Sequence, residues 1–211
     1  MSKISVIMPC FLGEYPQAAK DRAIKLNRAI RSFLEQDYEQ RELIIVADGC
    51  HKTLDFIKNN YSLNRNIKTY FIQKQELFSG TVRDFGLKIA DGEYITYLDS
   101  DDFYKNTNHL SVIMSGFKSN PECKWLYFND WVKYFHLDHL PMTERNVELT
   151  QGSIGTSNIA HVHEQNISWE GKNGYGHDHH FISSLMAQYP NYKKIEGCSY
   201  VVCHIPNTCD S

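Results

Sequence analysis

The stretch Gly92-Glu93-Tyr94-Ile95-Thr96-Tyr97-Leu98-Asp99-Ser100-Asp101-Asp102 decides the fold of this 211-residue chain. Residues 94–98 are aromatic, β-branched or leucine, which is the composition of a buried strand. Three carboxylates follow within four positions, where that strand should end. In an open α/β sheet, ligands bind beyond the carboxyl ends of the strands, so the stretch predicts a binding crevice.

The three carboxylates would repel one another unless a cation lies between them. Mg²⁺ and Mn²⁺ prefer oxygen ligands and, when one or two carboxylates hold them, usually also hold a phosphate. The acidic stretch therefore predicts a divalent-metal site. The alternative is an acidic turn in which Asp101 or Asp102 caps a helix that begins after Asn106.

The composition indicates one globular domain over residues 1–211. Hydrophobic residues make up 42%, charged residues 22%, and the formal net charge is -3. These values exclude a disordered chain and provide no basic surface for nucleic acid. No apolar run reaches the roughly 20 residues of a membrane span, and no secretory signal precedes the first strand. The six cysteines form no Cys-x-x-Cys pair, so we expect reduced thiols and a cytoplasmic protein.

Strand and helix patterns alternate through the first half of the chain. Strands are expected over 3–8, 43–47, 67–72 and 94–98, and helices over 20–36, 52–59 and 79–90, the last with Ser79 as N-cap. Such alternation implies an α/β fold with a parallel sheet and right-handed crossovers. The second half predicts helices over 107–118 and 178–188, a strand or hairpin arm over 125–135, cleft loops and short strands over 138–176, and a last strand over 200–205.

Four segments, in this order and spacing, resemble family 2 glycosyltransferases of the GT-A fold. They are residues 4–9, which resemble the opening strand, 42–49, which resemble "EIIVVDDGS" with Ala47 at the first aspartate, 80–94, which resemble "G-x-x-x-A-R-N-x-G-L-x-x-A-x-G-E-Y", and 98–102, which resemble "LDSDD". The resemblance implies a mostly parallel central sheet flanked by helices, with the nucleotide site at the carboxyl ends of the strands. It assigns residues 1–105 to the nucleotide sugar and 106–211 to the acceptor. Such domains also stand alone in large DNA viruses and bacterial capsule clusters, and we name a viral source, with the host cytoplasm as location, as one hypothesis.

The resemblance also implies a set of residues that bind the nucleotide sugar. The set is Pro9, Asp48, Arg83, Asp99 and Ser100. A carboxylate at position 48 can accept a hydrogen bond from a pyrimidine N–H, which in this family belongs to uracil. Arg83 lies in the first turns of a helix, where a guanidinium suits a diphosphate or a base carbonyl. The alternatives are a plain turn at Asp48 and a surface arginine that pairs with Asp84 or Asp91.

The implied metal is Mn²⁺ or Mg²⁺, which stabilises the leaving diphosphate as a Lewis acid. The resemblance assigns Asp101 to the metal and Asp99 to the ribose, the metal or both. Residues 198–204 are similar to a C-terminal strand in related GT-A enzymes, where a histidine completes the metal shell. His204 is therefore a third expected ligand, and a structural histidine is the alternative.

An inverting transfer needs a general base on the acceptor hydroxyl. In the family this base is a carboxylate in a "G-x-E-D" motif before a helix, and residues 174–181 occupy that place. We expect Asp178 to be the base, with His177 standing where the family often has glutamate. The alternative is that Asp178 only caps the helix.

Further histidines and aromatic residues have open roles. His177, His179 and His180 surround Asp178 and could bind a metal, contact a phosphate or face solvent, and we place no zinc there. His161 and His163 share a strand face and are expected in solvent rather than in the acceptor cleft. Candidates for stacking on a sugar, or for the core, are Trp131, Trp169 and Tyr175.

The sequence thus predicts a metal-dependent glycosyltransferase. It would move a hexose or deoxyhexose from a UDP-sugar to a hydroxyl of a glycan or glycoprotein, inverting the anomeric centre. The alternative is a non-catalytic module that binds nucleotide sugars, and the direction of the Asp178 side chain would distinguish the two. A nucleotidyltransferase or a dinucleotide oxidoreductase is disfavoured, because residues 11–15 supply neither a basic Gly-rich loop nor G-x-G-x-x-G. The donor sugar, the acceptor and the oligomeric state stay open.

Overall fold

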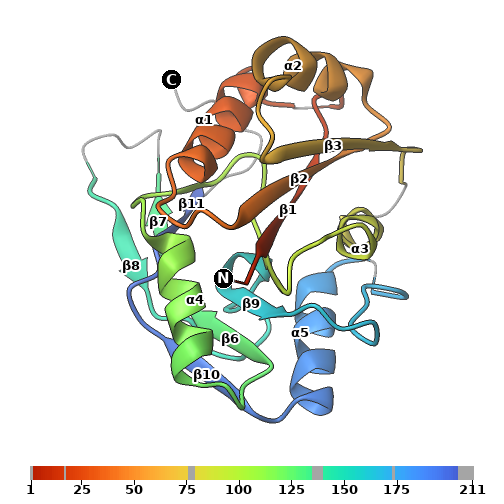
Figure 1. Ribbon diagram of the computed structural model, residues 1–211. Helices are drawn as coiled ribbons and strands as arrows, with labels where there is room; N and C mark the ends of the chain where they lie inside the picture. The colour runs from red at the N-terminus through yellow and green to blue at the C-terminus, as the bar shows by residue number, and fades with distance from the viewer. Residues whose placement is uncertain (1, 17, 76–78, 135–139, 173, 204–211) are drawn as a thin grey trace.

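The computed structural model describes residues 2–16, 18–75, 79–134, 140–172 and 174–203. Its main sheet has seven strands in the order β10-β6-β9-β4-β1-β2-β3 (Figure 1). Their bounds are β1 Ile4–Cys10, β2 Arg41–Asp48, β3 Ile67–Ile72, β4 Tyr94–Tyr97, β6 Trp125–Phe128, β9 Ile159–Val162 and β10 Tyr192–Ile195. β1 pairs in parallel with β2 and β4, and β2 with β3. The four strands expected in the first half, and their parallel pairing, are therefore confirmed.

Helices cover both faces of this sheet. α1 (Arg22–Leu34), α2 (His51–Tyr61) and α4 (His109–Ser119) contribute to the hydrophobic cluster on one face, and α3 (Gly80–Lys88) and α5 (His177–Gln188) pack on the other (Figure 1). Successive side chains of a strand point to opposite faces, so Val6 packs on the α1 side while Ile7 packs beside Leu87 of α3. The α/β prediction is confirmed, with helix bounds that differ by a few residues.

The second half of the chain departs from the predicted pattern. β9 runs antiparallel to both β4 and β6 in the middle of the sheet. The arm expected over 125–135 divides into β6 and β7 (Asp130–Lys133), which belong to different sheets. A second sheet, which the sequence did not predict, has the order β5-β11-β7-β8, with β5 at Phe103–Tyr104, β8 at Thr143–Arg145 and β11 at Tyr200–Cys203.

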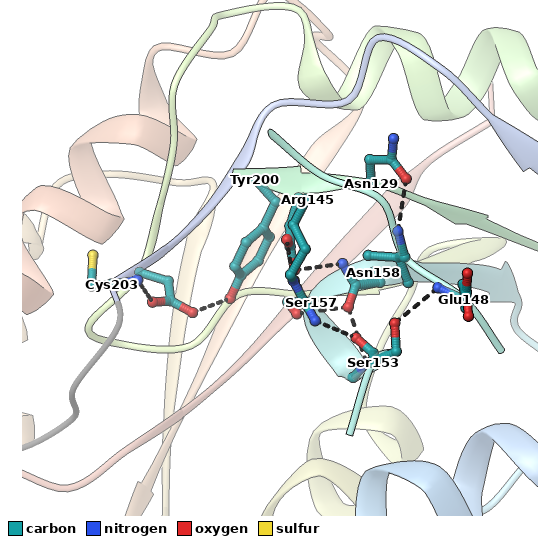
Figure 2. A network of polar contacts seen from close by, with 12 residues as sticks. Asn129, Arg145, Glu148, Ser153, Ser157, Asn158, Tyr200 and Cys203 are labelled. Atoms are coloured by element: carbon teal, nitrogen blue, oxygen red, sulfur yellow. Dashed lines mark hydrogen bonds and ion pairs between the residues drawn. The ribbon is translucent and has the colours of Figure 1, made fainter. Parts of the chain in front are cut away.

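A polar network that includes Arg145 and Asn158 connects this small sheet to the segment before β9 (Figure 2). Asp130 is fully buried and accepts hydrogen bonds from Arg145 at 2.9 and 2.5 Å. Its Oδ2 also accepts from Asn158 Nδ2 at 2.8 Å. Asn158 ends the short 3₁₀ helix η2 (Thr156–Asn158), so the network fixes the chain where it enters the main sheet.

The acidic stretch is not a helix cap. The N-cap of α4 is Asn108, and no side chain caps it. Asp102 is buried and accepts hydrogen bonds from the Cys203 N–H at 2.8 Å and the Tyr200 hydroxyl at 2.9 Å, both in β11 (Figure 2). Asp102 therefore joins the acidic loop to the small sheet.

His161 corrects another expectation. Its side chain is fully buried, with Nε2 2.8 Å from the Tyr97 hydroxyl and Nδ1 2.7 Å from the Val162 carbonyl, and burial lowers its pKa to about 4. The expectation that it faces solvent is wrong. His163 instead contacts the Gly92 carbonyl through Nδ1 at 2.9 Å.

The sequence analysis also expected reduced thiols and no membrane span, and the described residues bear on both expectations. Cys10, Cys50, Cys123 and Cys198 are free thiols and buried, and Cys203 is buried with its Sγ 3.0 Å from Arg28 Nη2. None of the helices within the described ranges combines the length and apolar character that a bilayer crossing requires.

Candidate functional site

A cavity of about 350 Å³ opens at the carboxyl ends of the first strands. The parallel register sets Cys10 beside Ala47 and Ile7 beside Tyr97, so β1, β2 and β4 end at the same edge. The cavity wall includes Pro9, Asp48, Arg83, Asp99, Ser100 and Asp101. The structure thus brings together every residue that the sequence predicted for the nucleotide sugar, among them the expected metal ligand Asp99, and adds a second expected metal ligand, Asp101.

Asp48, the last residue of β2, is buried and faces this cavity. Its Oδ1 accepts the Gln75 N–H at 2.7 Å, and its Oδ2 lies 2.5 Å from Lys74 Nζ. Gly49 follows with φ of 65°, so the plain-turn feature is present as well. The Asp48 carboxylate nevertheless has a specific partner in Lys74. A nucleobase that hydrogen-bonds to Asp48 would have to share this carboxylate with Lys74 or displace Lys74 from it.

Phe11 is a cavity residue that the sequence reasoning missed. Lys74 Nζ lies 4.7 Å from the centroid of its ring, and the ring forms part of the wall. The signal available in the sequence was an aromatic residue two positions after Pro9, just beyond the end of β1.

Arg83 contacts a carboxylate on each side. It lies in α3, is 3% exposed, and donates from Nη2 to Asp99 Oδ1 at 2.7 Å. Its Nη1 lies 3.6 Å from Asp178 Oδ1 and donates to the Ser79 hydroxyl. Burial opposes the charged form of Arg83, but the two carboxylates outweigh it and raise the pKa of the guanidinium.

The alternative partners of Arg83 are occupied elsewhere. Asp84 pairs with Lys88 at 2.6 Å, and Asp91 pairs with Lys68 at 2.5 Å. Ser79 holds the N-cap position of α3 but makes no capping hydrogen bond with its side chain. The interpretation of Arg83 as a surface arginine is therefore wrong.

Asp178 lies in the first turn of α5 and does not cap it. The N-cap is Gly176, whose φ of 81° is left-handed, and no side chain caps the helix. Asp178 Oδ1 lies 3.0 Å from His177 Nε2 in addition to its contact with Arg83. Burial raises the pKa of Asp178, but Arg83, His177 and the Thr156 N–H together lower it, which favours an ionised carboxylate near neutral pH.

His177, whose role the sequence left open, contacts the residues around Asp178. Its Nε2 lies 3.1 Å from Arg83 Nη1 and 3.4 Å from the Ser79 hydroxyl, and its Nδ1 lies 3.1 Å from the Gly174 carbonyl. His179 lies 3.5 Å from the Ser183 hydroxyl, and His180 is exposed, so the three histidines do not converge. Of these three histidines, only His177 contacts Arg83 and Asp178.

None of the three aromatic candidates lines the cavity, although the Trp169 ring lies behind the wall residue Arg83, 5.5 Å from its Cζ. Trp169 is 1% exposed and stacks on Phe181 with ring centroids 3.9 Å apart, so it belongs to the core. Trp131 lies in the small sheet under Lys105 Nζ, and Tyr175 is 89% exposed.

The carboxylates of the acidic loop fit a divalent cation whose remaining ligands come from a phosphate. Asp99 and Asp101 line the same cavity, and burial together with the charge of Asp99 raises the pKa of Asp101. A cation would offset that cost, and phosphate oxygens and water would complete its shell. No group of three or more His, Cys, Asp or Glu within the described ranges could hold a metal alone. His204 lies outside the described residues.

The comparisons with known proteins agree with this geometry. The family described as "Glycosyl transferase family 2" matches residues 5–162. An uncharacterized glycosyltransferase of Haemophilus influenzae is 36% identical over 107 residues, which cover 50% of this chain and 39% of the relative. A GalNAc(5)-diNAcBac-PP-undecaprenol beta-1,3-glucosyltransferase of Campylobacter jejuni is 31% identical over 103 residues, covering 48% and 30%. The chain thus spans well under half the length of these relatives.

Solved structures show the same fold at low identity. Staphylococcus aureus TarS 1-349 in complex with UDP-GlcNAc superposes with a TM-score of 0.73 at 16% identity, covering 96% of this chain and 59% of that chain. The mannosyltransferase PcManGT of Pyrobaculum calidifontis, in complex with GDP-Man and Mn²⁺, gives 0.66 at 13% identity, covering 96% and 57%. With the GT-A architecture and a family match over most of its length, the chain belongs to glycosyl transferase family 2.

Proposed function

We propose that the protein transfers a hexosyl or deoxyhexosyl group from a UDP-sugar to a hydroxyl of a glycan or glycoprotein acceptor. Family membership supports sugar transfer, and the UDP-GlcNAc complex of TarS supports a uridine nucleotide. The observation that carries the proposal is the buried Arg83, which contacts Asp99 of the donor cavity and Asp178 of the second half. The proposed location is the cytoplasm.

The donor would lie along the edge where the strands end. Asp48 would accept the uracil N–H, and the Phe11 ring would form the wall beside the base. Asp99 and Asp101 would hold Mn²⁺ or Mg²⁺, which when bound stabilises the charge on the leaving diphosphate. Ser100 and Pro9, which line the same cavity, would complete the wall around the diphosphate and ribose.

The proposed general base is Asp178. Its lowered pKa keeps the carboxylate ionised, so it can accept the proton of an acceptor hydroxyl as that oxygen attacks the sugar. Arg83 and His177 orient the carboxylate through contacts of 3.6 and 3.0 Å. A single displacement of this kind inverts the anomeric centre.

A non-catalytic module that binds nucleotide sugars remains the second candidate. Such a module would keep the cavity but would have no carboxylate placed to act as a general base beside it. The orientation of Asp178 favours the enzyme, because its carboxylate faces a cavity residue instead of capping its own helix.

Calorimetric titration with UDP, GDP and CMP, each with and without Mn²⁺, tests the donor site. We expect binding of UDP alone among the three, strengthened by metal. Absence of nucleotide binding in the presence of Mn²⁺ would refute the transferase proposal.

Asp178→Asn then tests the base. We expect UDP binding to stay at the wild-type level and hydrolysis or transfer of the UDP-sugar to fall about 10²- to 10⁴-fold. Asp91→Asn is the matched control, because its side chain is 61% exposed and pairs with Lys68 away from the cavity. Binding without turnover in the wild type, with UDP-sugars and simple glycans, would favour the binding module.

A further inference from the structure

The two oxygens of the Asp178 carboxylate have different surroundings. Oδ1 is buried, 3.6 Å from Arg83 Nη1 and 3.0 Å from His177 Nε2. Oδ2 lies 3.6 Å from the position that a Cβ of Gly155 would occupy. Because the Asp178 side chain is 31% exposed while Oδ1 is buried, Oδ2 is the carboxylate oxygen that a substrate can reach.

The backbone does not require a glycine at position 155. Its φ of -135° and ψ of -176° are extended, a conformation that any residue adopts. A Cβ here would lie 3.6 Å from Asp178 Oδ2 and from Ser157 Oγ, which is an ordinary van der Waals distance. A side chain would therefore fit the fold, but it would cover the exposed oxygen of Asp178. The missing side chain leaves room there for an atom of a ligand.

Tyr175 lies on the loop that leads into α5 and is 89% exposed. It stands between Gly174 and Gly176, whose φ values of 89° and 81° are left-handed. Gln151 packs against this loop, since its Nε2 lies 3.0 Å from the position of a Cβ on Gly176. Residues 151–155 therefore run alongside residues 176–178, with the Gln151 amide near Tyr175 and Gly155 near the carboxylate.

An exposed aromatic ring, an amide and an uncovered carboxylate are together suited to a saccharide. The face of an aromatic ring packs on apolar C–H groups, and amide and carboxylate groups bond to hydroxyls. Tyr175 and Asp178 are three residues apart, so their Cα atoms are separated by at most about 11 Å. An acceptor saccharide can contact both residues across this distance.

We propose that Tyr175, Gln151 and Gly155 form an acceptor subsite, which binds a pyranoside with its reacting hydroxyl at Asp178 Oδ2. The inference rests on the proposed function, since it takes Asp178 as the general base. As the acceptor oxygen bonds to the anomeric carbon, its proton passes to Oδ2, and the electron pair of the broken bond leaves with the diphosphate. The three subsite residues lie outside the four segments of the first half that resemble the family.

Ligand-observed NMR tests the subsite on the protein saturated with UDP and Mn²⁺. The probes are the methyl glycosides of glucose, galactose and N-acetylglucosamine, and saturation transfer to their ring protons measures binding. We expect the wild type to bind at least one of them. In Tyr175→Ala the Kd should rise about 3- to 10-fold, the scale of one aromatic contact. Tyr175→Phe, which keeps the ring, should retain the wild-type Kd.

Gly155→Ala adds one methyl group beside Oδ2. We expect the Kd of the glycoside to rise about 10-fold, the scale of one methylene group in a binding site, while UDP affinity and Tm stay at the wild-type level. Leu63→Ala is the control for Tyr175→Ala, because Leu63 is 96% exposed and lies between α2 and β3. It should leave the Kd of the glycoside unchanged.

Three results would count against the subsite. Equal glycoside affinity in the wild type, Tyr175→Ala and Gly155→Ala would overturn it, and if thermal unfolding shows that Gly155→Ala does not fold, the two Tyr175 variants decide. Binding of UDP without binding of any of the three glycosides would also overturn it and would leave the donor site standing. Failure of UDP to bind in the presence of Mn²⁺ would instead refute the proposed function and the inference with it.

Discussion

Replacing Arg83 by methionine should destabilise the fold in a pH-dependent way. The guanidinium is 3% exposed and contacts Asp99 at 2.7 Å and Asp178 at 3.6 Å. Removal of one partner from a buried ion pair costs about 3–5 kcal/mol. Both carboxylates are about a third exposed (33% and 31%), so water partly replaces the lost cation. We therefore expect a loss of about 2 kcal/mol at pH 7.5, or about 4–8 °C in Tm for a chain of this size.

The sign of the pH dependence follows from Asp178. In the wild type its pKa is lowered, so its ionised form stabilises the fold above its unfolded-state pKa, and this contribution disappears as the pH falls through the lowered value. Without Arg83, burial becomes the dominant effect and His177 remains as the basic neighbour, so the pKa of Asp178 rises. As the pH falls, protonation of Asp178 then removes the unpaired buried charge from the Arg83→Met variant, so the variant regains stability. The difference between the two proteins should shrink between pH 7.5 and pH 4.

Urea unfolding at both pH values measures this difference. Arg31→Met is the matched control, because Arg31 is 67% exposed and its partner Glu35 is 4.0 Å away, so its removal should cost less than about 0.5 kcal/mol. An Arg83→Met variant that is no less stable than the control, or whose deficit is the same at both pH values, would refute the reasoning.

Two further changes test the framework that holds the site. Arg145→Ala leaves the fully buried Asp130 without its cationic partner, so we expect urea unfolding to show a loss of stability of about 2–3 kcal/mol. A loss below about 1 kcal/mol would show that Asp130 does not depend on Arg145. Gly49→Ala should lower the free energy of unfolding by at least about 2 kcal/mol, because φ is 65° and a Cβ would lie 2.5–2.7 Å from Lys74 atoms. Gly152→Ala is the control: its φ is 82° but no atom lies within 4 Å of the new Cβ, so it should cost only about 1 kcal/mol. Equal losses in the two glycine variants would contradict the contact with Lys74.

The cavity at the carboxyl ends of β1, β2 and β4, which we propose binds the donor, could be predicted from the sequence because its residues follow from local patterns and one topological rule. β1, β2 and β4 consist mainly of apolar residues, and parallel pairing sets their carboxyl ends at one edge. Asp48 and Asp99 come directly after such runs, so the fold brings them together without any knowledge of side-chain packing. Arg83 reaches the same edge because it lies near the beginning of α3.

The second half could not be predicted in the same way. β9 and β10 have four residues each, and β9 owes its place to antiparallel pairing with β4, more than sixty residues earlier. Such distant pairing leaves no periodic signal in a short strand. The same holds for Lys74, whose approach to Asp48 depends on where the chain turns after β3.

The proposed base depends on this unpredictable part of the fold. The Thr156 N–H helps lower the pKa of Asp178, and Thr156 begins the 3₁₀ helix that Asn158 ends. Asn158 is held by Asp130, which Arg145 neutralises. Pro9 and Asp48 therefore lie in central strands and Asp99 follows one closely, whereas the surroundings of Asp178 rest on a side-chain network between short elements. Changes in that network should alter catalysis and acceptor choice while the donor cavity keeps its shape, because strand ends hold their side chains more rigidly than loops do.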